Sequence, residues 1–248
     1  MADTILKVKE LRKRFGGITA VDGVSFEVTQ GEILGIIGPN GCGKSTLFNC
    51  ILGQLRPSEG RVILDGQDVT GLPSSAISSR GVSRTFQLIQ VFPQLSVREN
   101  LILAAQEHRG TMISRLFGPR DVGLTGAADT MIAFFRLGHL ADARAGTLSY
   151  GQQKLLDVAM AFMAGPRMVL LDEPAGGVNL TMLGHLEERL RAINTEQGAT
   201  FVVIEHNMDF VMRLCTRVVV LSEGRKIAEG TPAQVRADPT VIAAYLGR

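Results

Sequence analysis

The sequence predicts an α/β fold built around a mostly parallel, buried sheet that a helical insert interrupts. Apolar runs of the kind found in strands buried on both faces recur along the chain, at Ile33–Ile37, Met168–Leu171, Phe201–Ile204 and Val218–Leu221. Helical periodicity separates the later runs; for example, apolar residues between Leu183 and Asn194 fall on one helical face. Buried strands that alternate with helices are typical of a parallel sheet.

The two ends of the chain and its middle show different patterns. Near the N-terminus, Val24, Phe26 and Val28 alternate with polar residues, which predicts a half-buried strand. From about residue 96 to 165 there is no strong strand pattern, and the apolar spacing favours helices. Within this stretch, the segment Arg109–Gly126 is rich in glycine, proline and charge, so we expect it to loop out.

Composition narrows the class of protein. The 248 residues include 26 Lys and Arg against 24 Asp and Glu, and this balance argues against a nucleic-acid partner. There is no run of 18 apolar residues to span a bilayer, and no signal-peptide pattern at the start. The three cysteines form neither a metal spacing nor a disulfide framework, so we expect a reducing, cytoplasmic setting.

The segment Gly38–Ser45, called the phosphate loop below, fits the pattern G-x-x-x-x-G-K-[ST] between a buried strand and a helix that begins near Gly43. Glycines let backbone N–H groups turn inward around oxyanions, and the helix start adds unpaired N–H groups. Lys44 can reach the β- and γ-phosphates, and the Ser45 hydroxyl can ligate Mg²⁺. The residues predicted to bind a nucleotide here are Gly38, Pro39, Asn40, Gly41, Cys42, Gly43, Lys44, Ser45 and Thr46. The loop alone fits a transporter ATPase, a small kinase or a GTPase.

Polar groups end two of the apolar runs. Asp172, which follows Met168–Leu171, is suited to hold Mg²⁺ directly or through water, and Glu173 is placed to act as a general base on an attacking water. His206 follows the run Phe201–Ile204, at a position where γ-phosphate sensors sit on parallel sheets. The other histidines are expected to be structural or solvated.

A further segment, Leu148-Ser149-Tyr150-Gly151-Gln152, resembles the signature motif of ABC ATPases, usually LSGGQ, and its Ser149 lies 23 residues before Asp172. The order of motifs also resembles that family over nearly the whole chain. It runs from an aromatic, Phe15, through the phosphate loop, Gln87 and the signature to Asp172, Glu173 and His206. Metabolic kinases and small GTPases share the phosphate loop but lack the signature.

This resemblance implies a P-loop NTPase (RecA-like) core with an N-terminal antiparallel β subdomain, approximately residues 1–95 and 166–248. A helical subdomain would occupy approximately residues 96–165. It also implies that two such chains sandwich two ATP molecules, so that the signature of one chain contacts the γ-phosphate held by the other. Such contact suits the start of the helix that follows Ser149, although Ser149 can also simply cap that helix.

The resemblance further assigns roles to single residues. Phe15 would stack on adenine, and Lys44, Ser45 and Thr46 would hold phosphates and Mg²⁺. Gln87 and Asp172 would complete the set of metal ligands. Hydrolysis would depend on Glu173 as base and on His206 at the γ-phosphate.

Details are similar to the ATPases of branched-chain amino acid importers: Arg84-Thr85-Phe86-Gln87, Tyr150 in the signature, Asp172-Glu173-Pro174-Ala175 and the tail from Gly230 to Gly247. The Arg109–Gly126 insertion resembles the longer of the two ATPases in such systems. The implied partners are a second ATPase chain (identical or related), membrane permease subunits near residues 87–97, and indirectly an external solute-binding protein. The implied location is the inner face of the cell membrane.

Three alternatives remain open: the ATPase of a lipopolysaccharide-type exporter, a non-transport ABC ATPase acting on ribosomes or DNA, and a nucleotide-binding scaffold without catalysis. The signature argues against the exporter. The single cassette with balanced charge argues against the ribosome or DNA protein, and the presence of both Glu173 and His206 argues against the scaffold. The transported substrate stays open between branched-chain amino acids, urea, amides and other small solutes.

Three residues depart from the usual family pattern. Tyr150 replaces glycine in the signature, Asn179 replaces a common aspartate, and Cys42 stands in the phosphate loop where Ala or Ser is usual. A thiol at a helix start can be oxidant-sensitive, but a tolerated small side chain is the favoured interpretation.

Overall fold

The computed structural model describes residues 3–85, 89–106 and 122–246, and its first layer is a four-stranded antiparallel sheet. Its strand order is β2-β1-β4-β5, with Val8 of β1 opposite Phe26 of β2 on one side and Val62 of β4 on the other. The strands are β1 (Thr4–Phe15), β2 (Ile18–Thr29), β4 (Glu59–Leu64) and β5 (Gln67–Asp68). The alternation seen in the N-terminal sequence is confirmed, since Val24, Phe26 and Val28 are buried.

The second sheet has six strands in the order β10-β9-β3-β8-β7-β6. All neighbours are parallel except β10, which is antiparallel to β9. The strands are β3 (Ile33–Ile37), β6 (Val82–Arg84), β7 (Met168–Asp172), β8 (Thr200–Ile204), β9 (Arg217–Ser222) and β10 (Arg225–Gly230). Every residue of β3, β7 and β8 is buried, as the unbroken apolar runs predict.

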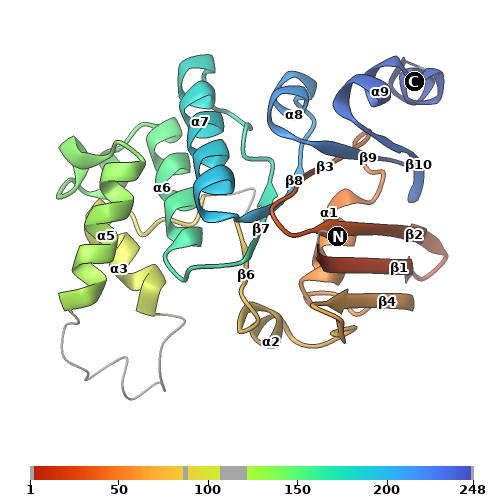
Figure 1. Ribbon diagram of the computed structural model, residues 1–248, viewed down its shortest axis with the longest axis horizontal. Helices are drawn as coiled ribbons and strands as arrows, with labels where there is room; N and C mark the ends of the chain where they lie inside the picture. Colours follow the sequence, from red (N-terminus) through yellow and green to blue (C-terminus); the bar gives the residue numbers. More distant parts are fainter. Residues whose placement is uncertain (1–2, 86–88, 107–121, 247–248) are drawn as a thin grey trace.

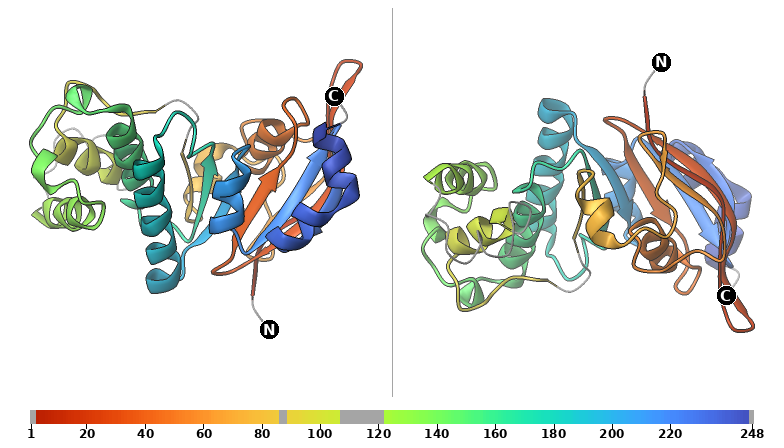
Figure 2. Two further views of the ribbon diagram at one scale, coloured as in Figure 1. Left: turned by 90° about the horizontal axis from the view of Figure 1, so that it is seen from above. Right: turned by 90° about the horizontal axis from the view of Figure 1, so that it is seen from below.

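The helices divide into groups along the long axis of the molecule. At one end lie α3, α5 and α6, and at the other lie α8, α9 and α10, with α7 between the groups (Figure 1; the two views of Figure 2 agree). The bounds are α1 (Lys44–Ile51), α2 (Ser74–Ser78), α3 (Val97–Gln106), α5 (Val122–Phe134), α6 (Tyr150–Phe162), α7 (Leu180–Gln197), α8 (Met208–Leu214), α9 (Pro232–Ala237) and α10 (Pro239–Leu246). Short 3₁₀ turns span Gly138–Leu140 and Ala145–Thr147.

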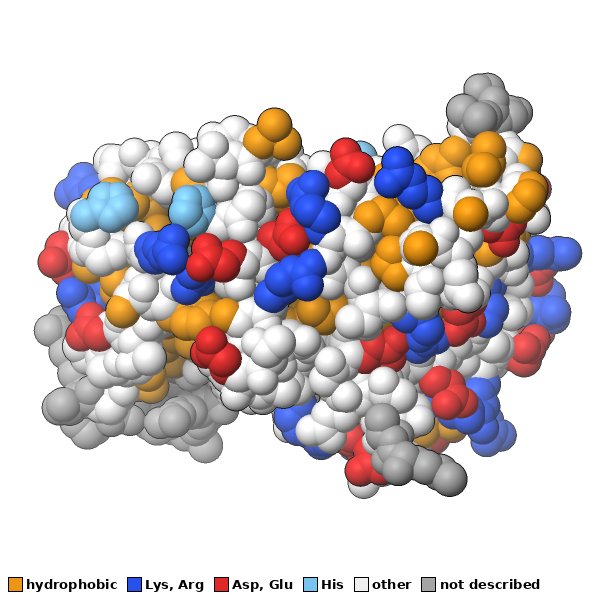
Figure 3. Space-filling view, turned by 45° about the horizontal axis from the view of Figure 1, so that its top comes forward, with side chains coloured by type: hydrophobic (Ala, Val, Ile, Leu, Met, Phe, Trp, Pro, Cys, Tyr) orange, Lys and Arg blue, Asp and Glu red, His pale blue; other side chains and the backbone are white. Residues whose placement is uncertain are grey.

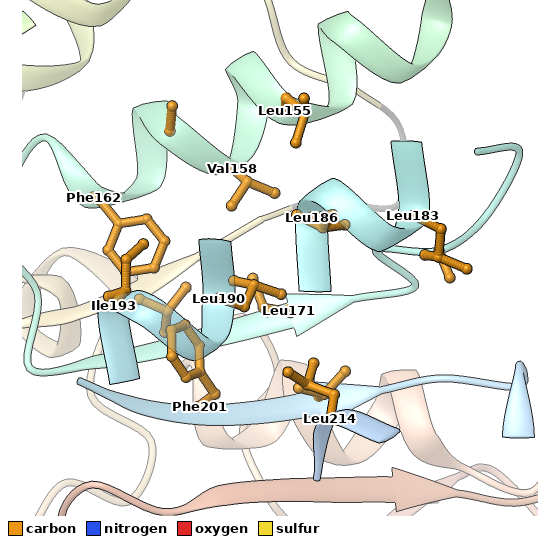
Figure 4. Close-up of a cluster of buried hydrophobic side chains, with 14 of the residues drawn as sticks. Leu155, Val158, Phe162, Leu171, Leu183, Leu186, Leu190, Ile193, Phe201 and Leu214 are labelled. Atoms are coloured by element: carbon orange, nitrogen blue, oxygen red, sulfur yellow. The ribbon is translucent and has the colours of Figure 1, made fainter. Parts of the chain in front are cut away.

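The central strands of the six-stranded sheet are buried on both faces because the sheet separates two hydrophobic clusters. On β3, Ile33 and Ile37 belong to one cluster, while Leu34 and Ile36 belong to the other. Figure 4 shows the first cluster, in which side chains of α6 and α7 meet above Leu171 of β7 and Phe201 of β8. The second cluster fills the space toward α1 and the four-stranded sheet. Buried on both faces, the strands hold their carboxyl ends, and the loops that follow, in a fixed arrangement.

The prediction that Arg109–Gly126 loops out is wrong for the C-terminal end of this segment. Residues 122–126 form the first turns of α5, where Leu124 and Ala128 are buried one helical turn apart and Ile132 continues the same stripe. This apolar stripe faces α3 and outweighs the low helix propensity of the local glycines. Residues 107–121 lie outside the described residues.

The surface carries no large area of one charge sign on the face shown in Figure 3, where acidic and basic side chains are interspersed. Among the helices of the described ranges, none combines the length and the apolar character needed to cross a membrane.

Candidate functional site

Four neighbouring parallel strands place the predicted site residues at one edge of the sheet. In the order β3, β8, β7, β6, their carboxyl ends lead into the phosphate loop, His206, Glu173 and Thr85. Ligands of open α/β sheets bind at this edge, because the loops that leave adjacent parallel strands converge there. Segments that are far apart in the sequence therefore form one site.

The phosphate loop depends on its glycines. Gly43 has φ of 101°, and a Cβ there would lie 2.2 Å from the carbonyl oxygen of Ala20 on β2. At Gly38, a Cβ would lie 2.1 Å from the carbonyl oxygen of Leu221 on β9. No side chain fits at either position without displacing backbone. The loop is thus pressed between two strands, whereas Asn40 and Gly41 at its tip are exposed.

Lys44 and Ser45 give the loop its cation and its hydroxyl. Lys44 is 7% exposed, and its Nζ donates hydrogen bonds to the carbonyl oxygens of Gly38 (2.7 Å) and Pro39 (3.0 Å), so the loop curls around the ammonium. Ser45 lies exposed in the first turn of α1. This arrangement of an ammonium, a helix start and a hard hydroxyl oxygen fits a polyphosphate with Mg²⁺.

Asp172 ends β7 as a buried carboxylate with an ionic partner. Its Oδ2 lies 2.6 Å from Nη2 of Arg84, and its backbone N–H donates to the Oγ1 of Thr85 (3.3 Å). Both partners come from the end of β6 and the residue after it. Sequence reasoning assigned no role to Arg84, although it directly precedes the segment that leads to Gln87.

Glu173 and His206 approach each other across the ends of β7 and β8. The Nδ1 of His206 lies 3.7 Å from Oε1 of Glu173. Glu173 adopts a positive φ of 48°, a conformation that costs a non-glycine residue about 1 to 3 kcal/mol and that recurs at functional sites. The structure thus brings the predicted base and the predicted γ-phosphate sensor together.

Glu205 has no role predicted from the sequence. It is fully buried, and its Oε1 accepts from the backbone N–H of Ala175 (2.6 Å). Its Oε2 accepts from the N–H groups of His206 (2.9 Å) and Asn207 (3.0 Å). One carboxylate therefore joins the loop after Glu173 to the loop that carries His206. The signal was present, since Glu205 ends an apolar run just as Asp172 does.

Two other residues were predicted to contact the nucleotide or its metal, and the structure describes Phe15 but not Gln87. Phe15 ends β1 with a half-exposed ring, and the Nζ of Lys13 lies 5.0 Å from the ring centroid. The hairpin that follows Phe15 borders the phosphate loop through Ala20. Gln87 lies outside the described residues, so its part in a metal site stays a prediction.

The sequence matches the ABC transporter family over residues 21–176, which spans the phosphate loop, the signature and Glu173. This chain belongs to the ABC transporter family. The C-terminal residues 225–248 also match a family described as "Branched-chain amino acid ATP-binding cassette transporter".

Relatives match this ABC cassette over its full length. It is 38% identical to the "High-affinity branched-chain amino acid transport ATP-binding protein BraF" of Pseudomonas aeruginosa, over 100% of this chain and 99% of that protein. It is 36% identical to the LivG protein of the same description from Escherichia coli, with the same coverage. An ABC transporter cassette solved in its ADP conformation superposes with a TM-score of 0.90 at 35% identity, covering 99% of this chain and 100% of that one. The predicted fold class and the family resemblance are confirmed.

The signature segment of the cassette lies apart from the phosphate loop. Figures 1 and 2 place α6 and α1 on opposite sides of β7 and α7. Ser149 caps α6 in a capping box, since its Oγ accepts from the N–H of Gln152 (3.4 Å) while Oε1 of Gln152 accepts from the N–H of Ser149 (2.9 Å). The simple capping role is therefore present.

The unusual Tyr150 of this cassette packs on the loop after Glu173. A Cβ added to Gly177 would lie 2.8 Å from Cε1 of Tyr150, and Gly177 has φ of 71°. The positive φ and the neighbouring ring therefore both favour glycine at position 177. Asn179, the second departure, accepts from the N–H of Met182 (2.9 Å) and caps α7. Both departures have local structural partners.

Cys42 of the cassette is buried, and the burial raises the pKa of its thiol even though Lys44 lies nearby. A raised pKa disfavours the reactive thiolate. This result supports the interpretation of Cys42 as a small, tolerated side chain and argues against oxidant sensitivity.

Asp157 on α6 is a buried carboxylate beside the loop that follows residue 88. Its Oδ1 accepts from the N–H of Gln90 (3.1 Å), and within the described residues its Oδ2 has no hydrogen-bond partner. Burial raises the pKa of Asp157 to about 6, although the Gln90 bond and Lys154 act in the opposite direction. The folded chain holds this proton more tightly than the unfolded chain. The contribution of the Asp157 carboxyl to the free energy of unfolding is therefore fully present below about pH 4 and is lost as the pH rises through 6.

We expect Asp157→Asn to remove this part of the pH dependence. A pKa of about 6 against an ordinary 3.8 corresponds to about 3 kcal/mol that the wild type loses between pH 4 and pH 7.5. The stability of the variant relative to wild type should therefore improve by up to that amount over this range, measured by denaturant unfolding at both pH values. Replacing the exposed Asp209 with asparagine is the control. An unchanged difference at the two pH values contradicts the prediction.

Proposed function

We propose that this chain is the ATP-hydrolysing subunit of an ABC importer that takes up branched-chain amino acids or related small solutes. The observation that carries the proposal is the convergence of Lys44, Asp172, Glu173 and His206 at one sheet edge. The full-length similarity to branched-chain amino acid transport ATP-binding proteins and the matching tail support the choice of substrate class.

In the proposed mechanism, Lys44 and the N–H groups of the phosphate loop bind the β- and γ-phosphates. The ligands Ser45, Gln87 and Asp172 would hold Mg²⁺, which when bound neutralises charge on the transferring phosphoryl group. Glu173 orients water and accepts its proton, and His206 donates a hydrogen bond to the γ-phosphate. The exposed ring of Phe15 would stack on adenine.

The proposed assembly contains a second ATPase chain. Since the signature lies apart from the phosphate loop within one chain, the start of α6 is free to contact the γ-phosphate of a partner. The γ-phosphate would then hold the two chains together, and hydrolysis would loosen them. Permease subunits would bind near residues 87–97 and keep the chain at the inner face of the membrane, and an external protein would deliver the solute.

Reconstitution tests this proposal. The chain is co-expressed with candidate permease, second ATPase and solute-binding subunits of a branched-chain amino acid importer, and the complex is placed in proteoliposomes. We expect ATP hydrolysis and uptake to rise with leucine, isoleucine or valine. Stimulation by urea or amides alone would change the substrate class. Purification with ribosomes, or stimulation by DNA without any uptake, would contradict the transport function.

A further inference from the structure

Arg84 lies between Asp172, a proposed metal ligand, and α1, the helix that carries the proposed ligand Ser45. Its side chain is 12% exposed, and Nη2 lies 2.6 Å from Oδ2 of Asp172, whose side chain is 6% exposed. The other arm, Nη1, donates to Oδ1 of Asn49 (2.8 Å) and Oε1 of Gln54 (2.8 Å). The guanidinium thus joins β7 to α1 and to the turn after it.

The position of Asn49 gives this contact its significance. Asn49 is four residues after Ser45 on α1, so the two side chains lie on one face of the helix, one turn apart. Arg84 therefore spans from the proposed aspartate ligand to the helix that carries the proposed serine ligand. Thr85, the next residue, accepts from the N–H of Asp172, so a single strand end holds both the backbone and the carboxylate of Asp172.

The chemistry of this contact requires arginine. A guanidinium presents several donors in a fixed plane, so its two arms can bind different acceptors at once, whereas a lysine ammonium acts as a compact point charge. The pair is largely buried, unlike surface ion pairs that contribute little. Charge-assisted bonds of this length also restrict the orientation of the carboxylate.

We propose that Arg84 is a positioning residue for Mg²⁺. By holding Oδ2 of Asp172 and the side chain of Asn49, it fixes the Asp172 carboxylate relative to Ser45 before the metal arrives. The proposal rests on the proposed function, because it assumes a nucleotide with Mg²⁺ at this edge. Residues that orient metal ligands from behind affect metal affinity rather than chemistry alone.

The test measures binding of a non-hydrolysable ATP analogue to the purified chain by calorimetry, first in EDTA and then over a Mg²⁺ series. For Arg84→Met, we expect the Mg²⁺ concentration for half-maximal effect to rise about tenfold, while affinity in EDTA changes less than about twofold. Arg84→Lys should shift this Mg²⁺ concentration in the same direction and by less. Asn49→Ala, which removes one of the two acceptors of Nη1, should also give a smaller shift. Mn²⁺ binding followed by electron paramagnetic resonance in the presence of the analogue gives a second readout.

A matched control is Arg167→Met, which removes an Arg–Asp pair of the same 2.6 Å length between exposed side chains. A lower Mg²⁺ requirement in Arg84→Met would overturn the proposal, because it would mean that Arg84 competes with the metal. Equal losses in EDTA and in Mg²⁺ would also overturn it and assign Arg84 a merely structural role. An unchanged Mg²⁺ requirement in Arg84→Met would overturn it as well. Failure of the transport assay, with the expected Mg²⁺ shift present in Arg84→Met, leaves the inference intact, so the two proposals fail separately.

Discussion

Replacing Glu173 with glutamine should abolish turnover while nucleotide binding persists. Glutamine keeps the size of the side chain but cannot accept the proton of water, and loss of a general base costs about 10²- to 10⁴-fold in kcat. The backbone of Glu173 is fixed independently, since its N–H donates to the carbonyl oxygen of Ile204 (2.9 Å). Phosphate release and ATP binding, measured on the same preparation, check the prediction.

Glu196, an exposed residue at the end of α7, offers a control of the same chemistry, and Glu196→Gln should hydrolyse ATP at the wild-type rate. Because hydrolysis would loosen the two chains, Glu173→Gln should also elute as a dimer when ATP is present. Near-normal turnover in Glu173→Gln would refute its role as base.

Replacing Glu205 with alanine should have the largest effect on stability. The substitution leaves the N–H groups of Ala175, His206 and Asn207 without their buried acceptor. Leaving a buried backbone donor unsatisfied costs about 1 to 3 kcal/mol. We expect a matching fall in the free energy of unfolding, measured with urea at pH 7.5. Turnover should also fall at temperatures where the variant is folded, because Glu205 joins the loops that carry Glu173 and His206.

A second variant separates charge from shape. In Glu205→Gln, one amide oxygen still accepts, but the amide nitrogen meets backbone donors, so the loss of stability should be smaller than in the alanine variant and still measurable. Glu196, exposed at the end of α7, gives the control Glu196→Gln with little change. Unchanged stability in both Glu205 variants would contradict the prediction.

The sequence predicted the sheet well because the physical cause is local. A strand buried on both faces is mostly apolar, and β3, β7 and β8 each contain an apolar run interrupted only at an end or by glycine. The phosphate loop, Asp172 with Glu173, and His206 were visible because each lies within two residues of the end of such a run. The start of α5 was missed because its stripe is short and its glycines suggested a loop.

The residues that support the site were not visible, for a different reason. Arg84 pairs with Asp172, which lies 88 positions away in the sequence, and Glu205 accepts from the N–H of Ala175, which lies 30 positions away. Such pairs arise only when β6, β7 and β8 become neighbours in the sheet, and no local pattern encodes that order. A charged residue at the end of a buried strand was the available signal, and it was read for Asp172 but not for Arg84 or Glu205.

The packing of Tyr150 on Gly177 also constrains how this chain can evolve. In a cassette with glycine in the signature, a methyl group at position 177 meets no aromatic ring, whereas here it would lie 2.8 Å from Cε1 of Tyr150. The effect of one substitution thus depends on the residue at the other position, which is epistasis with an identifiable steric cause. Because the φ of 71° at position 177 disfavours any side chain even without the tyrosine, the ring adds a second cost to a substitution that the backbone already resists.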